Sequence, residues 1–107
     1  MAFVTRLLGA GVTNAGTQTV PYSVSSPKLG AIVQNIRFVN AGGSAVTVNL
    51  FFKPNGGNQV RILDKDWSVS AGGFVFVEPE LTMGQSDAIE VTTSAAMDYL
   101  VSGVEKI

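Results

Sequence analysis

The chain has 107 residues, with seven basic and eight acidic side chains and a formal net charge of −1. That length suits a single domain, and the near-neutral charge gives no electrostatic basis for nucleic-acid binding. The sequence holds neither cysteine nor histidine, which excludes disulfides, thiolate nucleophiles, serine–histidine catalysis and the commonest transition-metal ligands.

Short blocks rich in Val, Ile, Thr and Phe run along the chain, separated by Gly, Asn, Ser and Pro. Such blocks predict an antiparallel all-β protein. In chain order, the predicted strands span residues 2–8, 17–24, 31–40, 45–53, 59–63, 67–70, 74–78, 88–93 and 97–106. Residues 83–86 are predicted to form a turn.

Regularly spaced short strands favour a single antiparallel β-sandwich, jelly-roll-like, with an immunoglobulin-like sandwich as the alternative. We divide the chain into an N-terminal strand or arm with a flexible connection, residues 1–16, and a β-sandwich domain, residues 17–107. Glycines at 9, 11 and 16 soften the connection. The arm is therefore expected to add a strand to a neighbour's sheet, and an ordinary first strand in its own sheet is the alternative.

Charge is unevenly distributed along the sequence. Residues 1–60 carry four basic side chains and no acid, whereas residues 61–107 carry three basic and eight acidic ones, which is 3 − 8 = −5. Such halves suit head-to-tail docking between subunits. Strands from both halves of a sandwich also intermix, so pairing of these charges within one subunit is the interpretation we favour.

Three patterns are typical of chemical sites, and each has a plainer interpretation that we favour. Asp64 and Asp66 beside Trp67 could hold calcium or a sugar, but Asp-Lys-Asp is also an ordinary hairpin turn. Glu78 and Glu80 offer the paired carboxylates of a glycosidase, or a solvated strand end. The glycine pairs at 42–43, 56–57 and 72–73 indicate hairpin turns and lack the motif of a phosphate loop. We expect no enzyme activity, metal or cofactor.

Five residues are candidates for contact with a partner protein. Phe3, Arg6 and Leu7 belong to the predicted arm. Phe51 is flanked by polar positions on its own face of the strand, so it is either exposed or covered by a second layer. Trp67 is either a large core residue or a surface contact.

Several stretches of the chain resemble small bacteriophage and prophage virion structural proteins. They are IVQNIRFVN (residues 32–40) with AVTVNL (45–50), SAGG (70–73) before a strand, and DYLVSGVE (98–105) near the end. The resemblance covers about residues 20–105, and capsid decoration (cement) proteins are the nearest group in size. It implies a sandwich or jelly roll that binds the outside of the head shell, often as a trimer, and stabilises the shell by bridging capsomers.

The expected partners are therefore further copies of the chain, and the major capsid protein or another virion protein, but neither nucleic acid nor membrane. Arg6 lies inside the first apolar stretch, which is atypical of a signal peptide. We expect synthesis in the host cytoplasm and a final location on the capsid surface. The alternative function is a small phage tail protein, or a receptor- or carbohydrate-binding module that stacks sugars on Trp67, Tyr22 or Tyr99.

Overall fold

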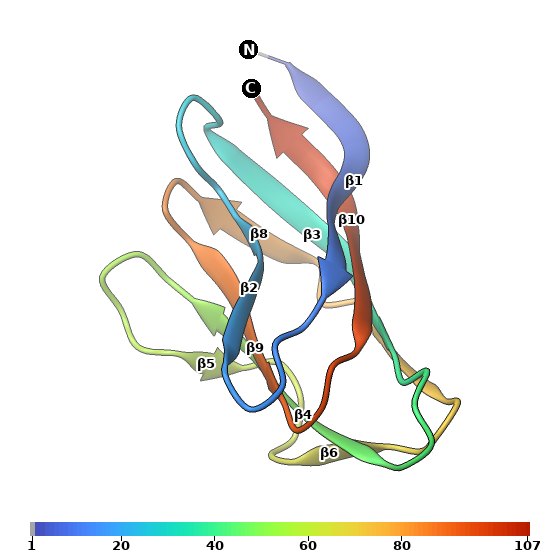
Figure 1. The fold of residues 1–107 in the computed structure, drawn as a ribbon. Helices are drawn as coiled ribbons and strands as arrows, with labels where there is room; N and C mark the ends of the chain where they lie inside the picture. The colour runs from blue at the N-terminus through green and yellow to red at the C-terminus, as the bar shows by residue number, and fades with distance from the viewer. Residues whose placement is uncertain (1) are drawn as a thin grey trace.

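The computed structural model describes residues 2–107, which form ten β-strands (Figure 1). The strands are β1 (Phe3–Val12), β2 (Gln18–Ser23), β3 (Gly30–Val39), β4 (Val46–Lys53), β5 (Val60–Arg61), β6 (Trp67–Val69), β7 (Phe74–Val77), β8 (Leu81–Gly84), β9 (Ala88–Thr93) and β10 (Asp98–Lys106). None of these residues lies in a helix that could cross a membrane. The all-β prediction is confirmed.

The strands form two five-stranded antiparallel sheets that pack face to face. Sheet A has the order β1-β10-β3-β7, with β8 also paired to β3. Sheet B has the order β2-β9-β4-β5, with β6 also paired to β4. The β1 and β10 ribbons run side by side, so the two termini lie close together at one end of the sandwich (Figure 1).

The strand order identifies the sandwich as a jelly roll. Because β7 and β8 share one position beside β3, and β5 and β6 share one beside β4, the ten strands fill eight positions. Their order is then 1-8-3-6 in sheet A and 2-7-4-5 in sheet B. The chain changes sheet at every step from β1 to β4 and again from β8 to β10. An immunoglobulin-like sandwich would instead place consecutive strands in one sheet as hairpins.

Alternation along the strands builds the core between the sheets. Val33, Ile36 and Phe38 of β3 and Val48 and Leu50 of β4 point inward and are fully buried, whereas their neighbours along each strand face outward. The largest fully buried apolar side chains of the core are Phe38, Ile36, Leu50, Met83, Ile89 and Met97. Asn40 is also buried, and its amide donates to the carbonyls of Ser44 and Val69, which fixes the turn after β3.

Two predicted boundaries differ from the structure. β1 continues past residue 8 to Val12, because Gly9 and Gly11 are strand residues rather than a soft hinge. A Cβ at Gly9 would collide with the Pro21 carbonyl oxygen, and one at Gly11 would lie 2.9 Å from the Tyr99 hydroxyl. Residues 81–84 form β8, where the sequence predicted no strand but a turn at 83–86. The turn follows the strand, and the Asp87 N–H donates to the Gly84 carbonyl.

β1 forms the edge of sheet A in its own chain. It pairs with β10 from Phe3↔Lys106 to Val12↔Asp98, with one bulge between Leu7 and Gly9. The alternative of an ordinary first strand describes this arrangement, and donation of the strand to a neighbour stays a prediction. The side of β1 that faces away from β10 pairs with no strand among residues 2–107.

Candidate interaction surface

The outer face of sheet A is the side of that sheet turned away from sheet B, and it is largely apolar. Strand register assigns to it alternate residues of β1, β10, β3 and β7. Seven large apolar side chains on this face are exposed: Phe3, Leu7, Val12, Ile32, Phe74, Phe76 and Leu100. A contiguous exposed apolar surface of this kind marks a site of protein contact more often than scattered single residues do.

Charge on this face is sparse. The charged strand residues that point outward from sheet A are Arg37, Asp98 and Lys106. The Arg37 guanidinium lies 4.7 Å from the centre of the Phe74 ring, and the Lys106 ammonium lies 5.9 Å from that of Phe3. Both cations therefore rest over aromatic rings, where the attraction is modest at exposed sites.

A shallow hollow of about 290 Å³ lies at the terminal end of the same face. Its wall includes outward-pointing side chains from four strands, namely Phe3, Ile32, Thr82, Val104 and Lys106. The lining is mainly apolar, with one ammonium group at Lys106. Such a hollow suits an apolar side chain of a partner, with a carboxylate nearby to meet the ammonium.

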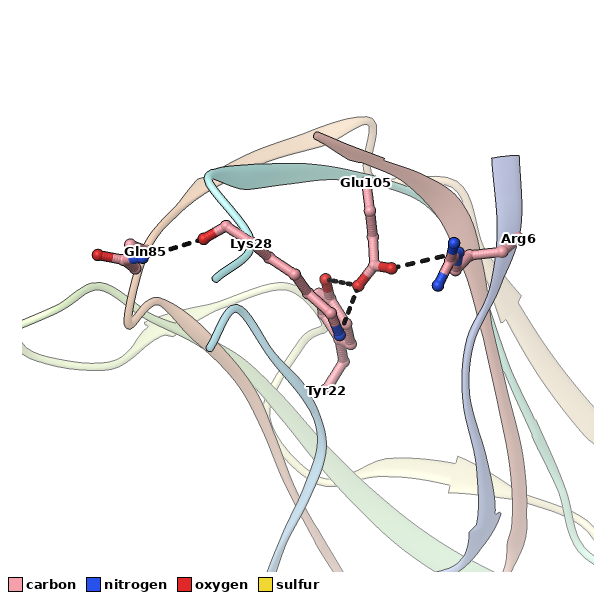
Figure 2. A network of polar contacts seen from close by, with 5 residues as sticks. All are labelled: Arg6, Tyr22, Lys28, Gln85 and Glu105. Atoms are coloured by element: carbon pink, nitrogen blue, oxygen red, sulfur yellow. Dashed lines mark hydrogen bonds and ion pairs between the residues drawn. The ribbon is translucent and has the colours of Figure 1, made fainter. Parts of the chain in front are cut away.

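Beneath this face, a buried carboxylate joins four segments of the chain (Figure 2). Glu105 on β10 points inward and is 1% exposed. Its Oε2 accepts a 2.6 Å hydrogen bond from the Tyr22 hydroxyl and lies 2.9 Å from Lys28 Nζ. Its Oε1 lies 3.3 Å from Arg6 Nε. The carboxylate thus ties β1, β2 and the loop before β3 to β10.

The surroundings of Glu105 keep it ionised. Burial alone would raise the pKa of this carboxyl, but the hydrogen bond from Tyr22 and the charges of Lys28 and Arg6 outweigh burial and lower it. Burial, together with the bond to Glu105, raises the pKa of the Tyr22 hydroxyl well above its usual range. The cluster is a structural clamp, since its carboxylate is already bound to three groups of the same chain.

The clamp was absent from the candidates drawn from the sequence, although a signal for it exists. In the strand at 98–106, alternation places Glu105 on the same side as the buried Val101. An acid at an inward position requires buried partners. Those partners are remote in sequence, 83 residues away in the case of Tyr22. Arg6 and Lys28 come from the basic half of the chain and Glu105 from the acidic half, so these charges pair within one subunit.

The outer face of sheet B carries a polar network instead. The Arg61 guanidinium lies 4.8 Å from the Phe51 ring centre and donates to Asn49 Oδ1 at 2.9 Å. The Asn49 amide in turn donates to Asp66 at 3.0 Å. Phe51 is thus half-buried under Arg61. This lies between the two predicted alternatives, an exposed side chain and one covered by a second layer. Beside them, Gln59 donates to Glu90 at 2.6 Å.

Of the three aromatic residues predicted to stack on sugars, Trp67 is the one whose side chain is exposed. It lies on β6 and is 43% exposed. Tyr22 is buried and bonded to Glu105, and Tyr99 packs against Phe38 on the inner side of sheet A. The structure therefore excludes Tyr22 as a stacking surface for sugars.

Asp66 and two of the glycine pairs lie in turns. Asp66 has a φ of 55° in the turn before β6, and its carboxylate accepts the Asn49 amide. Among residues 2–107, no group of three or more acidic side chains is placed to hold a metal ion. Gly56 and Gly72 have φ of 72° and 73°, so both pairs that contain them form turns that require the left-handed region.

Comparison with known proteins gives a likeness in structure but no match in sequence. Neither a protein family nor a curated protein matches the sequence. Among solved structures, the chain is similar to one described as the structure of infectious bursal disease virus, Gt strain, with a TM-score of 0.49 and 10% sequence identity. The matched region covers 96% of this chain and 32% of that one, so this chain spans about a third of its length.

Proposed function

We propose that the protein is a virion structural protein, most specifically a capsid decoration (cement) protein that works as a homo-oligomer on the head surface and bridges capsomers. The observation that carries the proposal is the exposed apolar outer face of sheet A, which nothing within the chain covers in residues 2–107. A surface of this kind is stabilised when another protein buries it. The resemblance of residues 20–105 to phage virion proteins supplies the type of particle.

The free edge of β1 is the proposed contact with the shell. β1 is ten residues long and carries a single charge, at Arg6, which is turned inward to Glu105. Long, uncharged edge strands offer unpaired backbone groups to a neighbouring strand. The capsid protein would therefore add a strand to sheet A beside β1.

Binding to heads tests the proposal directly. The protein is mixed with heads purified from the phage that encodes it, and the pellet is assayed after sedimentation. Saturable binding, with a higher temperature of DNA release from decorated heads, is the expected result. Failure to sediment with heads would overturn the decoration function, and binding to purified tails instead would favour the tail alternative.

Two neighbouring proline variants test the role of the β1 edge. Successive strand residues point their N–H groups to opposite sides, so one of Val4 and Thr5 faces β10 and the other faces the free edge. Val4→Pro and Thr5→Pro should therefore differ in melting temperature. The variant that keeps the higher melting temperature should lose head binding. Deleting residues 1–16 is less informative, because it also removes the Arg6 and Thr13 contacts to the core.

Exposure of Trp67 favours a receptor- or carbohydrate-binding module as the second candidate function. Trp67 follows Asp66 in the chain, and both the carboxylate and the N–H of Asp66 are bonded to Asn49 in the polar network of sheet B. Trp67→Ala separates the two candidates. Loss of binding on a glycan array with unchanged melting supports a sugar platform. A loss of about 3–5 kcal/mol in the free energy of unfolding would mark Trp67 as a core residue.

A further inference from the structure

The outer residues of β10 are arranged symmetrically about Ser102. Asp98 and Lys106 each lie four residues from it along a strand without a bulge of its own, so all three side chains point to the outer face of sheet A. Leu100 and Val104 lie at the two positions between them. The strand therefore presents an acid at one end, a base at the other, apolar residues between and a small residue at the centre.

We infer that the outer face of sheet A docks against the same face of a second copy, around a two-fold axis that crosses β10 at Ser102. The inference rests on the self-association proposed above and not on shell binding. A two-fold axis across the strands lays β10 antiparallel over β10 of the second copy. Lys106 then meets Asp98 of the second copy, and the symmetry repeats this ion pair at the other end.

The other strands of the face are also matched by this axis. Leu7 pairs with Ser102 across β1 and β10, so it meets its own counterpart beside the axis. Phe3 and Val12, at opposite ends of β1, are brought together. These contacts would bury apolar side chains that are exposed in the single chain.

The hollow finds an occupant in the same arrangement. Phe76 lies beside Arg37, and Thr82 beside Ile32, so the two side chains flank the middle of the sheet on either side of the bulge in β3. The axis therefore carries Phe76 of the second copy over Thr82, at the wall of the 290 Å³ hollow. An aromatic side chain entering a hollow is a common centre of binding energy.

The size of the face is sufficient for a stable dimer. Four strand positions at about 4.8 Å, along roughly 30 Å of strand, give a flat area near 600 Å² per chain. Two chains would then bury at least about 1,200 Å², which reaches the range of specific interfaces.

Charge decides between this axis and the alternative that runs along the strands. An axis along the strands would place Asp98 over Val39 and Lys106 over Gly30 of the second copy, where buried charges lack partners. The axis across the strands pairs them. It also keeps both β1 edges on the same side of the dimer, where the two edges can contact neighbouring capsomers together.

Mass in solution, measured by light scattering over concentrations up to about 1 mM, tests the dimer. Wild type should reach 22.4 kDa, twice the 11.2 kDa of one chain. Leu7→Asp should raise the dissociation constant at least about 100-fold, because two carboxylates then face each other at the axis. Val60→Asp is the matched control, since Val60 on β5 is 57% exposed against 55% for Leu7. It should leave the mass unchanged.

A charge exchange supplies a second test that does not depend on Leu7. Lys106→Glu and Asp98→Lys should each weaken the dimer about 10-fold, and the double variant should restore it. A wild type that stays monomeric, a trimer, or a dimer indifferent to Leu7→Asp and to the exchange would each overturn the inference. If a monomeric protein binds heads, the decoration function stands and the dimer is wrong. If the protein forms the dimer but does not bind heads, the dimer stands and the decoration function is wrong.

Discussion

The two outer faces of the sandwich have the same number of strands but opposite surfaces. On sheet B, the outward side chains satisfy one another: Arg61 covers Phe51 and binds Asn49, and Asn49 holds Asp66. On sheet A, exposed apolar side chains such as Leu7 and Phe76 form no such network. The contrast separates a face completed within one chain from a face that gains stability only when a partner buries it.

One glutamate in each sheet gives a second contrast. β10 of sheet A turns Glu105 inward to the clamp with Tyr22 and Lys28, whereas β9 of sheet B turns Glu90 outward to Gln59. Glu105 therefore lies inside the sandwich, where it fastens β1 and β2 to β10, and adds no charge to the outer face of sheet A. This placement leaves the outer face of sheet A with few charges and keeps the edge strand in place.

Removing each carboxylate should show the largest difference between the sheets. Glu105→Ala is expected to lower the free energy of unfolding by about 3 kcal/mol, because Tyr22 loses its acceptor and two cations lose their partner. Glu90→Ala, at an exposed pair, should change it by less than about 0.5 kcal/mol. Urea unfolding measures both. Equal losses in the two variants would show that the clamp adds no stability beyond a surface contact.

Gly103 tests how rigid sheet A is at its centre. It faces the core opposite the bulge in β3, and a Cβ there would collide with the Ile32 carbonyl oxygen. Gly103→Ala should therefore cost about 1–3 kcal/mol. Gly43→Ala is the control, since nothing lies within 4 Å of its added Cβ. A Gly103→Ala variant that melts with wild type would mean that β3 shifts freely at the bulge, and that sheet A is not a rigid face.

Much of the fold follows from the sequence because alternation is local. The Ala88–Thr93 strand was predicted with its observed bounds, and the alternation of β3 and β4 identified Phe38 and Leu50 as residues of one face each. β8 was missed because its four residues end in Gly84, and a glycine at that position led to the prediction of a turn.

The candidate surface could not be predicted to the same depth. Phe3 and Leu7 were candidates for partner contact as members of the predicted arm, and both are exposed on the outer face of sheet A, but that face also needs Leu100 and Phe76. These residues come together only through the order β1-β10-β3-β7, which joins strands far apart in sequence. Strand order depends on pairing between strands that are distant in sequence, so it cannot be read from the composition and spacing of a single sequence.

Acid should weaken the clamp and leave the rest of the sandwich less affected. The pKa of Glu105 is lowered in the folded chain from an ordinary value of 4.5, so its stabilisation is present in full above that value. It is lost as pH falls from about 4.5 through the folded pKa. The gap in unfolding free energy between wild type and Glu105→Gln should therefore shrink from pH 7 to pH 3, measured by urea titration. A gap that is constant with pH would contradict an ionised Glu105.

The smallest effect is expected on the outer face of sheet B. Asn49→Ala removes the amide that links Arg61 to Asp66. Because these groups are exposed and can bind water instead, the loss should be about 0.5–1 kcal/mol in urea unfolding. The mass in solution should stay that of wild type, since this face has no role in the proposed dimer. If Asn49→Ala instead dissociated the protein, the network on sheet B would be the assembly surface, and the two faces would exchange their assignments.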